Sequence, residues 1–367
     1  MAILIIFTII LFYVGQFIER LPSRFIAYVF NSLLFVGLLY CFLDLTYTAD
    51  WGMYYLFFKR EETSTDPVFY WLTLIFKKGL NLQYTELYQF HIFLIISLYY
   101  FFISRFTKNV FFIFLAYLML DNVHLANQIR YYLGFPILMS GFYFLFYRKN
   151  YILSIALILI AVLCHAGLSF LLICIPIYYF IPIKRFYRYC IVLSGLVFVV
   201  ALFIFNSSLG TVLNHFGGYF AKDNQSSFLG GLYNGIPYIL FTSFLYIETI
   251  SLIHQKPEVI EDPKFRFLYK ISFFAMIFIP GSFIIQIIGH RYVMPLTIIW
   301  LLYYYLYFIK DQDPKQKLIR FSILTAIIFV SSLFIYILPD YIFGHSHFSE
   351  EFLDMVKSSD RLKIFLN

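Results

Sequence analysis

The order of apolar and polar residues predicts a chain of membrane-crossing helices. Long apolar stretches alternate with short clusters of Lys and Arg, and most of them suit one crossing of about 20 residues. Three stretches are too long for a single crossing and are basic at both ends: residues 109–147, 151–181 and 267–309. Because basic loops tend to stay cytoplasmic, each is predicted to be a hairpin whose tip faces outward.

The three predicted tips hold polar residues that are costly to keep in so apolar a chain. They lie at Asp121–Arg130, at Cys164–Gly167 and at Gly289–Arg291, and each contains an arginine, a histidine or both. The two halves of the second hairpin are short, so its tip, with His165, is expected to lie in a recess below the membrane surface.

This pattern predicts an all-α polytopic membrane protein with about twelve transmembrane helices. A single helical bundle is expected over residues 1–338, interrupted by outer loops at 44–87 and 206–234. Within the first loop, Pro67–Leu80 is too short to span and is predicted to be an interfacial or re-entrant helix. The tail, residues 339–367, is expected to return to the outer side.

Composition narrows the class of protein further. The chain is 62% hydrophobic and 13% charged, which no soluble domain could bury. Its net charge of +7 is a topology signal here, and no basic patch with base-stacking aromatics suggests nucleic acid. The four cysteines have no metal-ligand spacing, and no glycine-rich phosphate loop is present. We therefore expect no metal, no cofactor and no nucleotide donor.

Arginines at two tips are the first candidates for chemistry. Arg130 opens a helix three residues after Asn127, where an arginine either snorkels to lipid headgroups or grips phosphate oxygens with its planar fork. Arg291 follows His290 and has no acidic neighbour in the sequence. Two outward arginines with no local counter-ion favour an anionic ligand.

Other candidates each have a structural alternative. His165 is either a satisfied core histidine or a group that accepts a hydroxyl proton or donates one to a leaving phosphate. Asp50, Trp51 and Tyr54 fit an interfacial aromatic belt as well as a sugar site. Asp66, followed by a proline, is predicted to be a helix N-cap.

Five short motifs together resemble a known family. They are Thr48-Ala49-Asp50-Trp51 followed by Tyr54, Asp66-Pro67-Val68-Phe69-Tyr70, Gln128-Ile129-Arg130, Cys164-His165-Ala166 and Gly289-His290-Arg291-Tyr292. Their order and predicted topology resemble the EpsG-like branch of the Wzy polysaccharide polymerases. Two features depart from that pattern: Ala49 stands where glycine is usual, and no arginine lies just upstream of Asp50.

The resemblance implies a GT-C-like polymerase of O-antigen, capsule or exopolysaccharide in the bacterial cytoplasmic membrane, with its active site facing outside. Its substrates would be undecaprenyl-pyrophosphate-linked oligosaccharides, joined by inverting, metal-independent glycosyl transfer. A chain-length regulator and membrane lipids would be its partners. Arg130, His165 and Arg291 would be catalytic; the substrate would be bound by Asp50, Trp51, Tyr54, Asp66, Tyr70, Asn127, Gln128, Tyr131, His290 and Tyr292.

Three other functions stay open at this point. A ligase that transfers the glycan to another acceptor would use the same donor chemistry. A transporter or flippase should place polar sites near mid-bilayer within paired repeats, whereas here they gather at outer tips. An acyltransferase using His165 as base would leave the two outer arginines unexplained.

Overall fold

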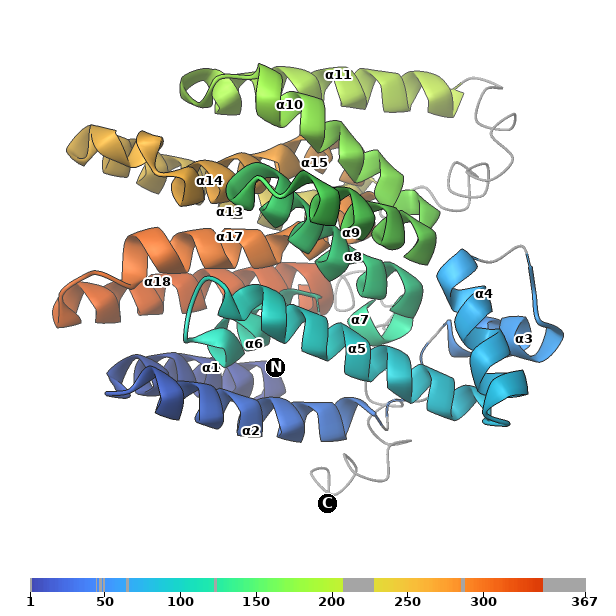
Figure 1. Ribbon diagram of the computed structural model, residues 1–367. Coiled ribbons are helices and arrows are strands. Elements are labelled where there is room, and N and C mark those ends of the chain that lie inside the picture. Colours follow the sequence, from blue (N-terminus) through green and yellow to red (C-terminus); the bar gives the residue numbers. More distant parts are fainter. Residues whose placement is uncertain are drawn as a thin grey trace. The chain divides into compact units, whose positions relative to one another are not determined.

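The computed structural model describes residues 2–43, 45, 48, 50–63, 66–121, 124–206, 228–284 and 288–338 (Figure 1). These residues fall into two compact units. The first, here called the N-terminal unit, runs from Tyr13 to Leu172. The second, the C-terminal unit, starts at Ile173 and includes the residues before Tyr13. The predicted tail, 339–367, lies outside the described residues.

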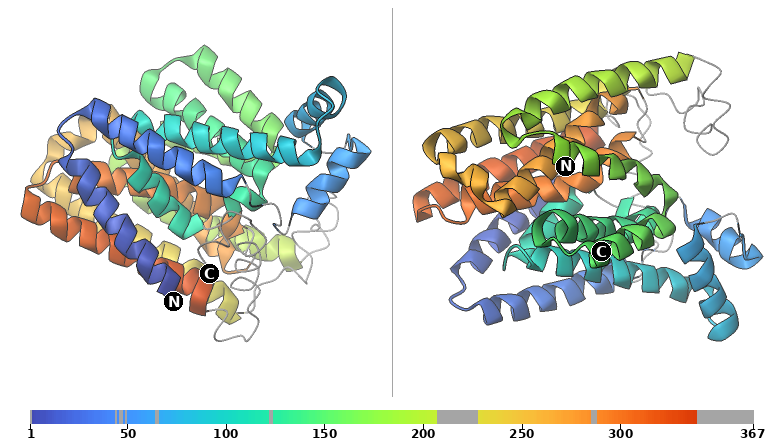
Figure 2. Two further views of the ribbon diagram at one scale, coloured as in Figure 1. Left: turned by 90° about the horizontal axis from the view of Figure 1, so that it is seen from below. Right: turned by 45° about the horizontal axis from the view of Figure 1, so that its top comes forward.

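Every regular element in the described ranges is a helix. After α1 (Ala2–Arg20), which the unit boundary crosses, the N-terminal unit contains α2 (Arg24–Phe42), α3 (Trp51–Arg60), α4 (Pro67–Leu74), η1 (Ile75–Gly79), α5 (Tyr84–Ser104), α6 (Val110–Asp121), α7 (His124–Asn127), α8 (Ile129–Phe142), η2 (Tyr143–Arg148), α9 (Tyr151–Cys164) and η3 (Ala166–Ile173). Helices α3, α4 and η1 gather at the start of α5 in all views (Figures 1 and 2).

The C-terminal unit is also helical throughout its described part. It contains α10 (Cys174–Phe180), η4 (Ile183–Arg185), α11 (Phe186–Asn206), α13 (Phe228–Gln255), η7 (Pro257–Glu261), α14 (Pro263–Phe274), η8 (Ala275–Ile277), α15 (Ile279–Ser282), η9 (Gly289–Val293), η10 (Met294–Leu296), α17 (Thr297–Tyr304), η11 (Tyr305–Ile309), α18 (Pro314–Ser332) and η12 (Leu333–Ile337).

The described helices confirm the all-α, multi-pass class. Seven of them are long and apolar enough to cross a membrane, or up to eight if one bent pair counts as a single span. Two apolar helices, α6 and α9, are shorter than a full crossing. The number of twelve spans and the GT-C-like scaffold stay predictions.

Helix breaks occur at all three predicted tips. Helix α6 ends at Asp121 and α8 starts at Ile129, α9 ends at Cys164, and α15 is followed by η9 at Gly289. The segment after Asp66 is also helical and, at Pro67–Gly79, too short to cross a bilayer. Basic flanks and apolar length therefore located the breaks correctly.

One boundary differs clearly from the sequence expectation. Helix α13 begins at Phe228, so the last seven residues of the predicted loop 206–234 are helical. Gly231, one of the glycines that suggested a loop, instead permits close packing, because a Cβ there would lie 2.0 Å from the carbonyl oxygen of Phe283. One turn later, a Cβ at Gly235 would lie 2.4 Å from the Phe283 ring. Small residues four apart allow such contact between membrane helices.

Polar side chains accept hydrogen bonds from backbone N–H groups where helices start at basic turns. Asn150 accepts a hydrogen bond from the N–H of Leu153 at 3.2 Å, and Asp313 accepts two at 3.0 Å from Lys315 and Gln316. Asp313 is the last residue of the turn Asp311-Gln312-Asp313, which precedes α18. Its role as an N-cap agrees with a structural function.

In the C-terminal unit, a buried lysine stabilises the bend between α10 and α11. The two helical stretches that meet there differ in direction by 117°. Nζ of Lys270 on α14 donates to the carbonyl oxygens of Tyr178 and Ile181 at 2.5 and 2.6 Å. It also lies 4.8 Å from the Tyr178 ring and 5.1 Å from the Phe186 ring. Carbonyls that the bend removes from helical pairing are thereby satisfied.

Candidate functional site

Arg130, at the start of α8, lies in an aromatic cage with one carboxylate. Its guanidinium carbon lies 5.0, 5.6 and 5.8 Å from the ring centroids of Tyr54, Phe57 and Phe69. Its Nη1 donates to Oδ2 of Asp66 at 2.8 Å, and the two side chains are only 15% and 12% exposed. Arg130 has no counter-ion nearby in the sequence, but the fold supplies one, because Asp66 stands 64 residues earlier in the chain.

Asp66 connects three helix ends with one carboxyl group. While Oδ2 accepts from Arg130, Oδ1 accepts the backbone N–H of Ala166 at 3.0 Å. Asp66 does stand at the N-cap position of α4, but its side chain makes no capping hydrogen bond there. The predicted N-cap position is therefore confirmed. The carboxylate, however, accepts the first N–H of η3, which starts at Ala166, and none from α4.

His165 is the single extended residue between α9 and η3. Its backbone has φ −158° and ψ 117°, and its Nδ1 accepts the N–H of Gly167 at 3.0 Å. Because Nδ1 acts as acceptor, the neutral imidazole carries its proton on Nε2. In this geometry the ring offers an N–H donor rather than a free basic nitrogen.

Arg130 and His165 are connected by Asp66 and also by Tyr131, the residue after Arg130. The ring of Tyr131 packs edge-on against the imidazole of His165, with centroids 5.3 Å apart. Helices α8 and α9 approach closely at Gly134, which has no side chain. A Cβ at this position would lie only 2.8 Å from the Ala161 carbonyl oxygen. The first two predicted catalytic residues thus share one site in the N-terminal unit.

Several predicted substrate-binding residues make internal contacts in the same unit. Oδ1 of Asn127 accepts the backbone N–H of Asp50 at 2.7 Å, which fixes the start of α3. Trp51 packs edge-on against Tyr84 and Tyr88 at 4.6 and 4.7 Å. Tyr54 is buried beneath Arg130, whereas Tyr70 on α4 is half-buried.

Buried polar atoms without hydrogen-bond partners gather on the elements around Arg130. Within the described part of the chain they include Nε of Arg130, Oε1 of Gln128, Oγ1 of Thr73, the Tyr84 hydroxyl and Nε2 of His91. Buried polar groups are nearly always satisfied in proteins, by protein atoms or by ordered water, so these atoms are candidates to contact a bound polar group or water.

His91 on α5 is a residue that the sequence reasoning missed. It is completely buried, its Nδ1 contacts the Leu87 carbonyl oxygen at 2.8 Å, and its ring lies 5.7 Å from Phe69, which also contacts Arg130. A histidine within an apolar run was the available signal, the same one that singled out His165.

The remaining predicted residues belong to the C-terminal unit. His290, Arg291 and Tyr292 lie on η9, where the Tyr292 ring stacks on Phe278 at 5.2 Å. Gly289 fits tightly on α15, since a Cβ there would lie 2.9 Å from that of Ser282. Convergence of Arg291 with Arg130 stays a prediction, because the two residues belong to different units.

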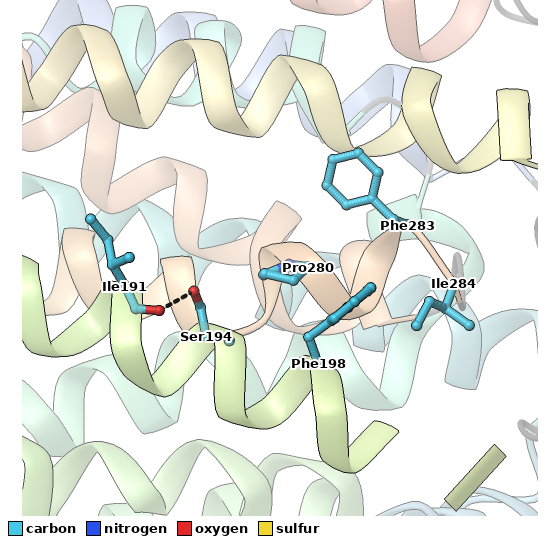
Figure 3. A pocket seen from close by; sticks show the side chains of 7 residues that line it. Ile191, Ser194, Phe198, Pro280, Phe283 and Ile284 are labelled. Atoms are coloured by element: carbon cyan, nitrogen blue, oxygen red, sulfur yellow. Dashed lines mark hydrogen bonds between the residues drawn. The ribbon is translucent and has the colours of Figure 1, made fainter. Parts of the chain in front are cut away.

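The C-terminal unit also contains an apolar pocket of about 570 Å³ between α11 and α15 (Figure 3). It is lined by Ile191, Ser194, Gly195, Phe198, Pro280, Phe283 and Ile284. The hydroxyl of Ser194 is already bonded to the Ile191 carbonyl oxygen at 2.7 Å. The lining therefore suits a hydrocarbon chain better than a sugar.

Comparison with protein families finds a match to the EpsG family over residues 29–344, most of the chain. The matched range contains every residue singled out above. No curated protein and no solved structure matches the sequence.

Proposed function

Because this chain belongs to the EpsG family, whose members are associated with polysaccharide polymerisation, we propose that it polymerises lipid-linked glycans. Its substrates are oligosaccharide repeat units carried on undecaprenyl pyrophosphate. The reaction takes place on the outer leaflet of the bacterial cytoplasmic membrane, with inversion at the anomeric carbon and without a metal.

The proposed reaction exchanges one bond to the anomeric carbon for another. A hydroxyl oxygen of the acceptor unit attacks that carbon, and the bond to the donor's pyrophosphate breaks with its electron pair. The hydroxyl proton passes to a carboxylate, for which Asp50 is our candidate because its backbone N–H is bonded to Asn127, three residues before Arg130. The main demand on the protein is to stabilise the charge that develops on the pyrophosphate.

The environment of Arg130 is the observation that carries this proposal. Asp66 engages Nη1, while Nε, on the side edge of the guanidinium, has no hydrogen-bond partner among the described residues. A phosphate can therefore bind that edge while the ion pair persists, and the cage fixes the plane of the fork. We propose Arg291 as the second cation.

His165 is assigned a role as hydrogen-bond donor to a phosphate oxygen of the leaving group. In the tautomer that the Gly167 contact selects, the ring carries its proton on Nε2 and can donate it. Of the two roles open from the sequence, the geometry favours donation over proton abstraction.

The proposed function is tested with purified protein and undecaprenyl-pyrophosphate repeat units in the presence of a chelator. We expect a ladder of glycans on a gel, growing by one repeat unit per step. Transfer only to an added lipid acceptor would identify a ligase instead. Lack of any transfer, from substrate that a known polymerase extends, would refute the proposal.

His165→Gln is expected to retain at least tenfold more elongation activity than His165→Asn. The glutamine amide places an N–H donor where Nε2 stands, whereas asparagine reproduces only the Nδ1 position. Initial rates at saturating substrate provide the measurement. Equal loss in both variants would indicate that a basic ring nitrogen is needed, and His165 would then be the proton acceptor.

A further inference from the structure

We infer that Asp66 is a positioning residue that fixes Arg130 and His165 relative to each other, rather than a group that binds sugar hydroxyls. Both of its oxygens have protein partners, Nη1 of Arg130 at 2.8 Å and the N–H of Ala166 at 3.0 Å. Ala166 directly follows His165. One carboxylate therefore holds the two residues assigned to the leaving group.

The contacts form a closed ring, which gives the arrangement its stiffness. Arg130 is followed by Tyr131, Tyr131 packs on His165, His165 is followed by Ala166, and Ala166 returns to Arg130 through Asp66. Low exposure of the ion pair strengthens its electrostatic attraction relative to a surface pair. Loss of the carboxylate would release the guanidinium and the turn at His165 together.

Asp66 also modulates the charge available to an anion. Its carboxylate compensates the guanidinium, so the caged Arg130 remains stable in a poorly hydrated setting, and it accepts an N–H at the start of η3. A neutral asparagine has only one acceptor oxygen and must leave one of the two contacts unmade.

Two measurements test this inference. The kinetic one rests on the proposed function, whereas the second depends on the geometry alone. Asp66→Asn is expected to lower kcat at least tenfold with less than a threefold change in KM, and Asp66→Glu to recover part of the loss. Ala166→Pro removes the N–H donor and places the ring Cδ against Oδ1 of Asp66, so it breaks the same contact from the other side. The extended His165 is compatible with a following proline. The variant should reproduce part of the kcat loss.

The second readout is modification of His165 by diethyl pyrocarbonate, followed by mass spectrometry without substrate. We expect the rate to rise at least threefold in Asp66→Asn and in Ala166→Pro. Asp313→Asn is the matched control, since Asp313 also accepts backbone N–H groups at a helix start but lies in the other unit.

Two results would overturn the positioning role. One is a raised KM with unchanged kcat in Asp66→Asn, which would mean direct substrate binding. The other is a rate of His165 modification that neither variant changes. If the wild-type protein makes no polymer, the proposed function fails, and the modification rates alone decide whether Asp66 positions the turn.

Discussion

Arg130→Lys is expected to lower the rate of glycan elongation at least a hundredfold while the protein stays folded. A lysine ammonium can still pair with Asp66, but it lacks the Nε edge that is assigned to the phosphate. It also lacks the flat surface that the three rings of the cage hold. Removal of one preorganised donor typically costs a factor of about 10²–10³ in rate.

The measurement is the initial rate of ladder growth at saturating repeat units. Arg60→Lys is the matched control, because Arg60 is an exposed arginine in the last turn of α3, and its rate should equal that of the wild type. An unchanged ladder in Arg130→Lys would remove Arg130 from the phosphate site.

Gly134→Val is expected to lower the stability of the N-terminal unit strongly. The added Cβ would lie 2.5 Å from Cδ1 of Leu168 and 2.8 Å from the backbone oxygen of Ala161. A side chain can move aside, whereas the backbone oxygen moves only if α9 shifts. Overpacking of this kind costs about 1–3 kcal/mol, and a shift of α9 would also displace His165.

Thermal unfolding in detergent, followed by helical circular dichroism, measures this effect as a lower apparent Tm. Gly37→Val on α2 makes the same exchange where no atom lies within 4 Å of the added Cβ. It therefore controls for helix propensity. An equal fall in Tm for both variants would mean that close packing of α8 on α9 does not contribute.

The sequence predicted the helix breaks because basic flanks and span length are local properties. It also singled out Arg130 and His165, since polar residues within an apolar chain are visible without a structure. The partner of Arg130 was not predictable in this way, because Asp66 lies 64 residues from Arg130 and 100 from Ala166. Nothing in the neighbourhood of Asp66-Pro67 distinguishes a carboxylate that caps its own helix from one that caps another.

Errors at α13 and His91 have different physical origins. Gly231 resembles a loop residue locally, and only its packing against Phe283 explains it in a helix. His91 stands in a long apolar helix, where no sequence signal tells whether the imidazole is satisfied. Burial and the unpaired Nε2 supply that information.

The lysine at the bend between α10 and α11, Lys270, is expected to limit how this part of the protein moves. Its ammonium contacts Tyr178 before the bend and Phe186 after it, while its stem belongs to α14. Opening the angle would separate the ammonium either from the Phe186 ring or from the carbonyl oxygens of Tyr178 and Ile181. These contacts should therefore hold the bend rigid. We expect α10, the start of α11 and α14 to move together as one rigid body.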